Sequence, residues 1–213
     1  MKKQQSKLLT LSAAFFTAFV LWTVLVSIFD VKPIGPLGSS VGFATFNQTF
    51  HGLTGVHLWL YFITDWLGLV PIGIALGFAV LGLIQLIRRK SILKVDRDIL
   101  VLGGFYIATF SVYCLFEAFP VNYRPILIDG FLEASYPSST TLLVSCIMPT
   151  AISQLGMRIK REKARKALII FCVAFTFFTV AARIISGVHW ISDIIGGALI
   201  SASLVLAYYA LKN

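Results

Sequence analysis

Six long apolar segments run along the chain, separated by short stretches that carry most of the charged residues. These segments lack the alternation of apolar and polar positions that is typical of elements in water-soluble proteins. A helix of about 20 apolar residues can cross a hydrocarbon core of about 30 Å. The pattern therefore predicts an all-α, polytopic membrane protein with six transmembrane helices, at residues 8–29, 66–87, 99–119, 138–157, 167–185 and 190–210.

The stretch 43–64 comes before the second predicted helix and mixes apolar, aromatic and polar residues. Trp59, Tyr61 and Trp66 are aromatic residues of the kind that is enriched at headgroup depth. We interpret 43–64 as an interfacial or re-entrant segment that leads into the second transmembrane helix. Asn47 begins a glycosylation sequon, but this pattern is frequent by chance and carries no prediction here.

The composition agrees with lipid as the solvent of this chain. Of its 213 residues 58% are hydrophobic and 13% are charged, and the mean hydropathy is +0.88. We expect one membrane-embedded domain over residues 1–213, and the first apolar segment is too long for the core of a typical secretory signal. The three cysteines lie inside apolar segments, where a small apolar role without a disulfide is expected: Cys114, Cys146 and Cys172.

The basic residues predict the orientation of the chain in the membrane. The net charge is +9, but the lysines and arginines occur in short runs between apolar segments, which argues against nucleic-acid binding. If the segments cross the membrane in turn, 15 of the 18 basic residues fall on one side, and this side is cytoplasmic by the positive-inside rule. Both termini are then cytoplasmic, and the plasma membrane is the expected location.

Most of the remaining ionisable residues gather at the opposite, outward ends of the last four predicted helices. Ionisable groups at membrane depth are costly and tend to mark functional sites. The residues concerned are Glu117, Arg124, Arg183, His189 and Asp193. Their clustering predicts a single site that faces the outside.

His189 and Asp193 are four residues apart at the start of the last predicted helix, so they share one helix face. An aspartate in this position can accept one ring N–H of the histidine and leave the other nitrogen free as a nucleophile. Arg183, at the end of the preceding helix, has a planar guanidinium group that suits a phosphate. The three residues therefore predict phosphoryl chemistry.

The order Arg124-Pro125, Pro137-Ser138 and Arg183 with His189 and Asp193 resembles the three-part motif of the type 2 phosphatidic acid phosphatases, membrane relatives of the vanadium haloperoxidases. The resemblance extends over residues 99–205. It implies a phosphohistidine mechanism in which His189 attacks phosphorus and Asp193 orients it. It also implies that Arg124, Arg183 and Ser138 bind the phosphoryl oxygens.

The chain departs from this motif at three positions. Glu117 replaces the family's lysine, and we expect it to pair with Arg124 or Arg183. Ser139 and Thr140 replace the glycine and histidine of the second motif, and the missing histidine is the family's general acid. His51, His57 or Glu133 could take over the role of the acid.

Two functions remain open from the sequence. The chain could be a membrane phosphatase or phosphotransferase that acts on a lipid phosphate or a polyprenyl diphosphate at the outer face. Alternatively, it could be a catalytically impaired member that binds lipid phosphate headgroups without turnover. We expect membrane lipids as partners and neither a metal ion nor another cofactor. A transport function has little support, since Asp65 is the only candidate for a charge at the middle of the membrane.

Overall fold

The computed structural model describes residues 2–212, and within this range the chain is built from helices. Residues 2–212 contain isolated β-bridges but no strand. Two short 3₁₀ helices lie at Pro36–Gly38 and Ile92–Lys94. The α-helices are α1 (Lys2–Ile28), α2 (Ala44–Thr54), α3 (Leu58–Leu67), α4 (Leu69–Arg89), α5 (Arg97–Ala118), α6 (Ser139–Arg158), α7 (Glu162–Ser186) and α8 (Ile191–Lys212).

Six helical segments of residues 2–212 are long and apolar enough to cross a membrane: α1, α3 with α4, α5, α6, α7 and α8. Large apolar side chains such as Phe16, Leu21 and Phe177 are exposed on their outer surfaces. Exposed apolar surface of this extent needs lipid as its solvent. The prediction of an integral membrane protein with six transmembrane helices is therefore confirmed.

The segment before the second predicted helix differs from its prediction in part. Residues 44–54 form the separate helix α2, but α3 continues almost directly into α4. The linking residue Gly68 keeps right-handed helical backbone angles, and its N–H bonds to the carbonyls of Thr64 and Asp65. Residues 58–64 therefore begin the second transmembrane segment, which runs from Leu58 to Arg89.

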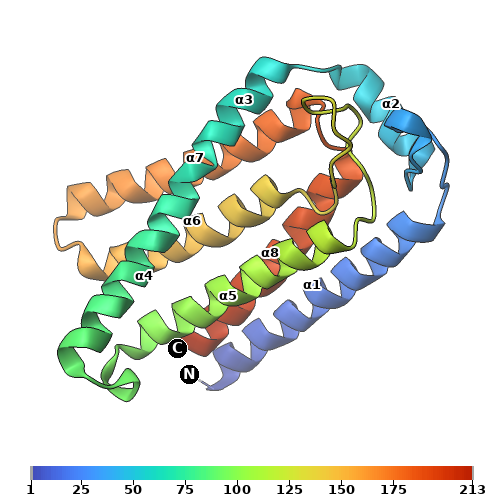
Figure 1. Ribbon diagram of the computed structural model, residues 1–213. Helices are drawn as coiled ribbons and strands as arrows, with labels where there is room; N and C mark the ends of the chain where they lie inside the picture. The colour runs from blue at the N-terminus through green and yellow to red at the C-terminus, as the bar shows by residue number, and fades with distance from the viewer. Residues whose placement is uncertain (1, 213) are drawn as a thin grey trace.

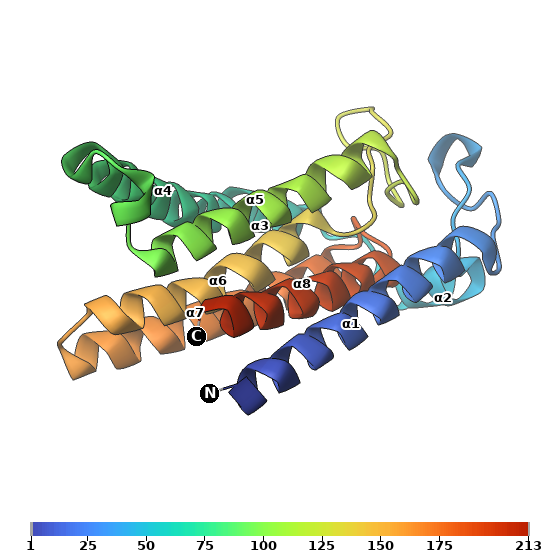
Figure 2. The same cartoon turned by 90° about the horizontal axis from the view of Figure 1, so that it is seen from below.

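The N- and C-termini lie at the same end of the helical bundle (Figure 1). Helix α1 packs along α8, while α6 packs against both α7 and α8. Figure 2 shows α4 on the side of the bundle away from α1, with α5 beside it. Near the end of α5, the ring of Phe116 packs edge-on against Phe19 of α1, with ring centres 5.7 Å apart. The main core includes Phe19 of α1, Leu102 of α5, Met148 of α6 and Tyr208 of α8.

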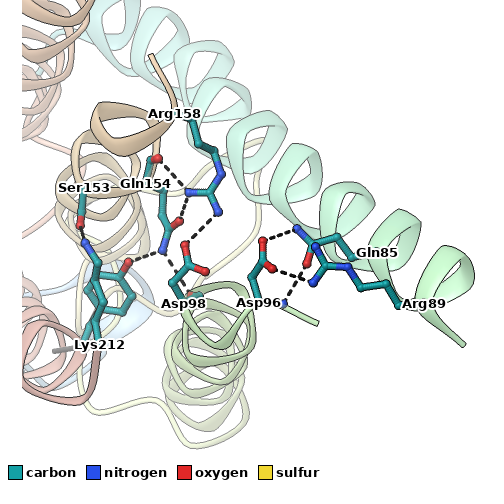
Figure 3. A network of polar contacts seen from close by, with 9 residues as sticks. Gln85, Arg89, Asp96, Asp98, Ser153, Gln154, Arg158 and Lys212 are labelled. Atoms are coloured by element: carbon teal, nitrogen blue, oxygen red, sulfur yellow. Dashed lines mark hydrogen bonds and ion pairs between the residues drawn. The ribbon is translucent and has the colours of Figure 1, made fainter. Parts of the chain in front are cut away.

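A polar network ties four helices together at the end where the termini lie (Figure 3). Asp98 of α5 forms an ion pair of 2.9 Å with Arg158 of α6, and Gln154 donates to the hydroxyl of Tyr208 across 2.7 Å. Asp96, just before α5, binds both Gln85 and Arg89 of α4. The network fixes the helices at the end that lies away from the site described below.

Candidate active site

The candidate site lies at the other end of the bundle, where the turn between α7 and α8 presents His189. Gly187 ends α7 in the left-handed conformation, with φ of 68°, and a Cβ atom there would lie 2.0 Å from the carbonyl oxygen of Gly55. Only glycine fits such a backbone and such a close approach. The backbone therefore turns sharply and carries His189 inward, where its side chain is buried.

Ser135 stands between His189 and Asp193. The Ser135 hydroxyl donates to Asp193 Oδ2 across 2.6 Å, and its oxygen lies 3.0 Å from His189 Nδ1. The carbonyl oxygen of Ser135 is 3.2 Å from the same ring nitrogen. The direct contact predicted between Asp193 and His189 is therefore replaced by a contact through Ser135, because the loop 119–138 inserts this residue between them.

The loop that carries Ser135 is held in register by backbone pairing. Tyr123 and Ala134 form an antiparallel bridge, and Ser135 N–H donates to the carbonyl of Asn122 across 2.9 Å. The same pairing brings Arg124 N–H to the carbonyl of Glu133. Residues 122–124 and 133–135 of one loop are thus held side by side.

Asp193 is fully buried and accepts hydrogen bonds at both oxygens. Asn122 Nδ2 donates to Oδ1 across 3.1 Å, and the backbone N–H of Trp190 donates to Oδ2 across 3.0 Å. Asn47 of α2 in turn binds Ser192, the neighbour of Asp193. Buried carboxylates need such partners, and these polar residues were not identified from the sequence.

The surroundings of His189 define which ring nitrogen is free. A carbonyl oxygen can only accept, so the Ser135 carbonyl favours a proton on Nδ1 and leaves the lone pair on Nε2. Nε2 is buried and has no hydrogen-bond partner among residues 2–212. Burial, together with the positive charges of Arg124 and Arg183, keeps the pKa of His189 well below its usual value of 6.5. A neutral histidine with a free Nε2 is suited to nucleophilic attack.

Two arginines bring positive charge to this histidine. Arg124 Nε lies 3.1 Å from Glu133 Oε2 in an ion pair that lacks hydrogen-bond geometry, and Arg124 Nη1 is buried without a partner in the described chain. Arg183 is 1% exposed, and its Nη2 donates to Thr140 Oγ1 across 2.7 Å. Its Nε and Nη1 are likewise without partners among the described residues. Buried guanidinium donors without partners are suited to an anionic ligand.

A small polar cavity of about 260 Å³ adjoins these groups. His189 and Arg124 line it together with Ser135, Glu117 and Glu133. A much larger apolar cavity of about 1060 Å³ lies beside α4 and α5, and Thr140 and Asp65 are among its lining residues. Tyr113 and Ser139 line both cavities, so the polar and apolar spaces meet at these two residues.

The comparisons with known proteins agree with this geometry. The family model of the PAP2 superfamily matches residues 101–213, which is more than half of the chain. The chain belongs to the PAP2 superfamily.

A solved structure of a similar fold supports this assignment. It is described as the first transmembrane PAP2-type phosphatidylglycerolphosphate phosphatase, from Bacillus subtilis. The match covers 93% of each chain at 16% sequence identity, with a TM-score of 0.58. At this identity the match shows the fold, a PAP2 membrane phosphatase fold, and leaves the substrate undefined. The comparison with curated proteins finds no match.

The second PAP2 motif is placed at the start of α6, where Ser138 caps the helix. Ser138 Oγ accepts from the N–H of Thr141 across 3.4 Å, and the N–H of Ser138 donates to the carbonyl of Asp193. Ser138 is buried and lines neither cavity, whereas the next residue, Ser139, lines both. Phosphate binding by Ser138 stays a prediction.

The altered positions of the PAP2 motifs have partners that the sequence did not indicate. Thr140, at the place of the missing histidine, accepts a hydrogen bond from Arg183. The predicted pairing of Glu117 with an arginine is wrong: Arg124 pairs with Glu133, and Arg183 pairs with Asp65 at 3.3 Å. The loop pairing that brings Glu133 to Arg124 explains the difference. Glu117 instead borders the polar cavity.

Of the three residues considered as replacement acids, only Glu133 lines the polar cavity. His51 Nε2 lies 3.0 Å from the carbonyl of Gly187, and His57 Nε2 lies 3.0 Å from the carbonyl of Thr54. The His51 side chain therefore contacts the α7–α8 turn, whereas the His57 side chain contacts the end of α2.

Proposed function

We propose that this protein is a membrane phosphatase or phosphotransferase that acts on a lipid phosphate or diphosphate through a phosphohistidine intermediate. One observation carries the proposal: His189 lines the same cavity as Arg124, its buried Nε2 has no hydrogen-bond partner among residues 2–212, and its Nδ1 contacts Ser135. This arrangement combines a free nucleophile with fixed cations.

In the proposed reaction His189 Nε2 attacks phosphorus, and the electron pair of the breaking P–O bond leaves with the lipid oxygen, which takes up a proton from water. Arg124 and Arg183 stabilise the charge on the phosphoryl oxygens, since preorganised cations act most strongly where charge develops. Asp193, through Ser135, keeps Nδ1 protonated and stabilises the positive ring of the intermediate. Water then attacks phosphorus and loses a proton to the solvent, the electron pair of the breaking P–N bond returns to Nε2, and phosphate is released.

The large apolar cavity supports a lipid as the substrate. It adjoins the polar cavity at Tyr113 and Ser139, so a lipid chain in the apolar space would place its phosphate beside His189. Because Thr140 is too weak an acid to replace a histidine near neutral pH, a substrate with a good leaving group needs less assistance. A polyprenyl diphosphate meets this condition as well as a lipid monophosphate does.

The second candidate function, lipid-phosphate binding without turnover, is favoured by the carboxylates of the polar cavity. Glu117 and Glu133 both line it, and they oppose a highly charged phosphoryl group. In addition, Thr140 stands where the family motif has a histidine, and its hydroxyl accepts from Arg183. The motif therefore provides no histidine to protonate the leaving oxygen.

One experiment separates the two functions. Purified wild-type protein and His189→Ala are incubated with lipid monophosphates and diphosphates of defined chain length, and phosphate release is measured. We expect release by the wild type, none by His189→Ala, and an acid-labile phosphohistidine after rapid quenching with radiolabelled substrate. Specific binding of these lipids without release from any of them would overturn the enzymatic function and support the binding function.

We propose that the site faces the outside of the plasma membrane. The support is the distribution of the basic residues, most of which lie at the start of α1, at the α4–α5 and α6–α7 connections and at the end of α8. These segments lie at the end of the bundle opposite the α7–α8 turn (Figure 1). A membrane-impermeant thiol reagent tests this on a variant without the three native cysteines. Labelling of Phe131→Cys from outside and of Lys163→Cys only after lysis is expected, and the reverse pattern would overturn the orientation.

A further inference from the structure

Helix α3 reaches the candidate site although it precedes residues 101–213, the part of the chain that matches the PAP2 model. The N–H of His57 donates to the carbonyl of Ser186 across 2.9 Å, which attaches the start of α3 to the end of α7. Tyr61 and Asp65 are four residues apart on α3 and therefore share one helix face. This face contacts the arginines of the site.

Tyr61 lies under both guanidinium groups. The centre of its ring is 4.9 Å from Arg183 Cζ and 5.6 Å from Arg124 Cζ, and its side chain is nearly buried. The face of an aromatic ring attracts cations, most strongly where water is absent. Two like charges that repel each other are thus held on one ring, which offsets part of the cost of bringing them together.

Asp65 and Thr140 hold Arg183 at a single nitrogen. Asp65 Oδ1 lies 3.3 Å from Arg183 Nη2, and Thr140 Oγ1 lies 2.7 Å from the same atom. Nε and Nη1 then remain free of partners in the described chain, although they are buried. A planar guanidinium that is bonded at one amino group and stacked on a ring is restricted in its orientation, which leaves its other donors for an anionic ligand in the proposed function.

We propose that Tyr61 and Asp65 are positioning residues that orient Arg183 and Arg124 for the phosphoryl group. This inference rests on the phosphate-binding part of the proposed function. It adds to the three family motifs a fourth element, the Tyr61–Asp65 face of α3. The face also explains a charge that the apolar sequence of this segment leaves unexplained, because Asp65 is the ion-pair partner of a buried arginine.

The test measures the affinity of inorganic phosphate for the purified full-length protein, together with kcat and KM for the lipid that the wild type hydrolyses best. The variants are Asp65→Asn, Asp65→Glu, Tyr61→Leu and Tyr61→Phe. Trp59→Leu is the matched control, because Trp59 also lies on α3 and its side chain is exposed. Thermal unfolding checks that every variant is folded.

We expect Asp65→Asn and Tyr61→Leu to weaken phosphate binding and raise KM by about tenfold, as misplacement of a binding group by a fraction of an ångström does. Tyr61→Phe keeps the ring face and should stay within about twofold of wild type. Asp65→Glu should recover part of the loss, and Trp59→Leu should bind phosphate as wild type does. Unchanged phosphate affinity in folded Asp65→Asn and Tyr61→Leu would overturn the inference.

A second result would also overturn it. If Asp65→Asn left phosphate affinity unchanged and lowered kcat only for substrates with poor leaving groups, Asp65 would be a proton donor and not a positioning residue. Phosphate binding is also measured for His189→Ala, which lacks the proposed nucleophile, so that binding is assessed separately from turnover. If phosphate affinity depended on Tyr61 and Asp65 but no lipid were hydrolysed, the inference would hold and the proposed enzymatic function would fail.

Discussion

Ser135 donates a hydrogen bond of 2.6 Å to Asp193 and so connects the loop before α6 to the first turn of α8. Because Ser135 also contacts His189 Nδ1 through its hydroxyl and carbonyl oxygens, the carboxylate acts on the histidine through an intermediate side chain. A buried chain of hydrogen bonds of this kind fixes the orientation of the ring and the location of its proton.

The first prediction concerns this connection. Ser135→Ala removes the hydroxyl between Asp193 and His189 while keeping the backbone carbonyl, so the ring loses one of its two contacts. We expect kcat for lipid phosphate hydrolysis to fall by about 10- to 100-fold with little change in KM. Ser27→Ala is the control, because Ser27 is exposed and its hydroxyl bonds only to its own helix. A rise in KM by as large a factor as the expected fall in kcat would show that Ser135 serves substrate binding.

The second prediction concerns pH. The pKa of His189 lies well below its usual 6.5 through burial and the charges of two arginines, so the ring stays neutral below pH 6.5. The unfolded chain binds a proton near pH 6.5 that the folded chain does not bind, so the free energy of unfolding should decrease as the pH falls below 6.5. His189→Gln should lose this pH dependence in thermal unfolding. The ring resonances of labelled His189 should not titrate at pH 6.5, and titration there would contradict the prediction.

The third prediction concerns the charge of the polar cavity. Glu117→Lys changes the charge beside Arg124 and His189 by two units, and it restores the lysine of the family motif. We expect KM for a lipid phosphate to fall by about tenfold, which corresponds to about 1.4 kcal/mol. The KM of Glu117→Gln should lie between those of the wild type and Glu117→Lys. Since Glu117 is exposed, the gain should shrink as salt is added, and a gain that persists at high salt would contradict an electrostatic origin.

The fourth prediction concerns the turn that carries His189. Gly187→Ala places a side chain in a left-handed conformation and against the carbonyl of Gly55. We expect the free energy of unfolding to fall by about 1–3 kcal/mol from the backbone conformation alone. Activity should also be reduced, because His189 is displaced. Gly73→Ala is the control, since Gly73 lies within α4 and a Cβ atom there meets nothing within 4 Å. Equal melting temperatures for the two variants would contradict the prediction.

The fifth prediction separates stability from function. Gln154→Leu removes the buried amide that contacts Tyr208 and Arg158 at the end where the termini lie (Figure 3). Buried polar partners left without hydrogen bonds cost about 1–3 kcal/mol, so the melting temperature should fall. KM should not change, because this network is remote from His189. A changed KM would show that the two ends of the bundle are coupled.

The sequence by itself determined the solvent, the number of transmembrane helices and the family. Long apolar segments need lipid around them, and segment length is set by the thickness of the hydrocarbon core, so six helices could be read without coordinates. The spacing of His189 and Asp193 on one helix face, with Arg124 and Arg183 nearby in the motif order, was equally a local property. These residues do lie together: His189 and Arg124 line one cavity, both arginines stack on Tyr61, and Ser135 links His189 to Asp193.

Only the tertiary structure decided which groups stand between these residues and which hold them. Ser135 separates Asp193 from His189 because a loop folds back on itself, and no helical spacing predicts the path of a loop. Asp65 pairs with Arg183 across 118 positions of the sequence. Contacts of this kind depend on how whole helices pack, and packing is a property of the assembled bundle and not of any single segment.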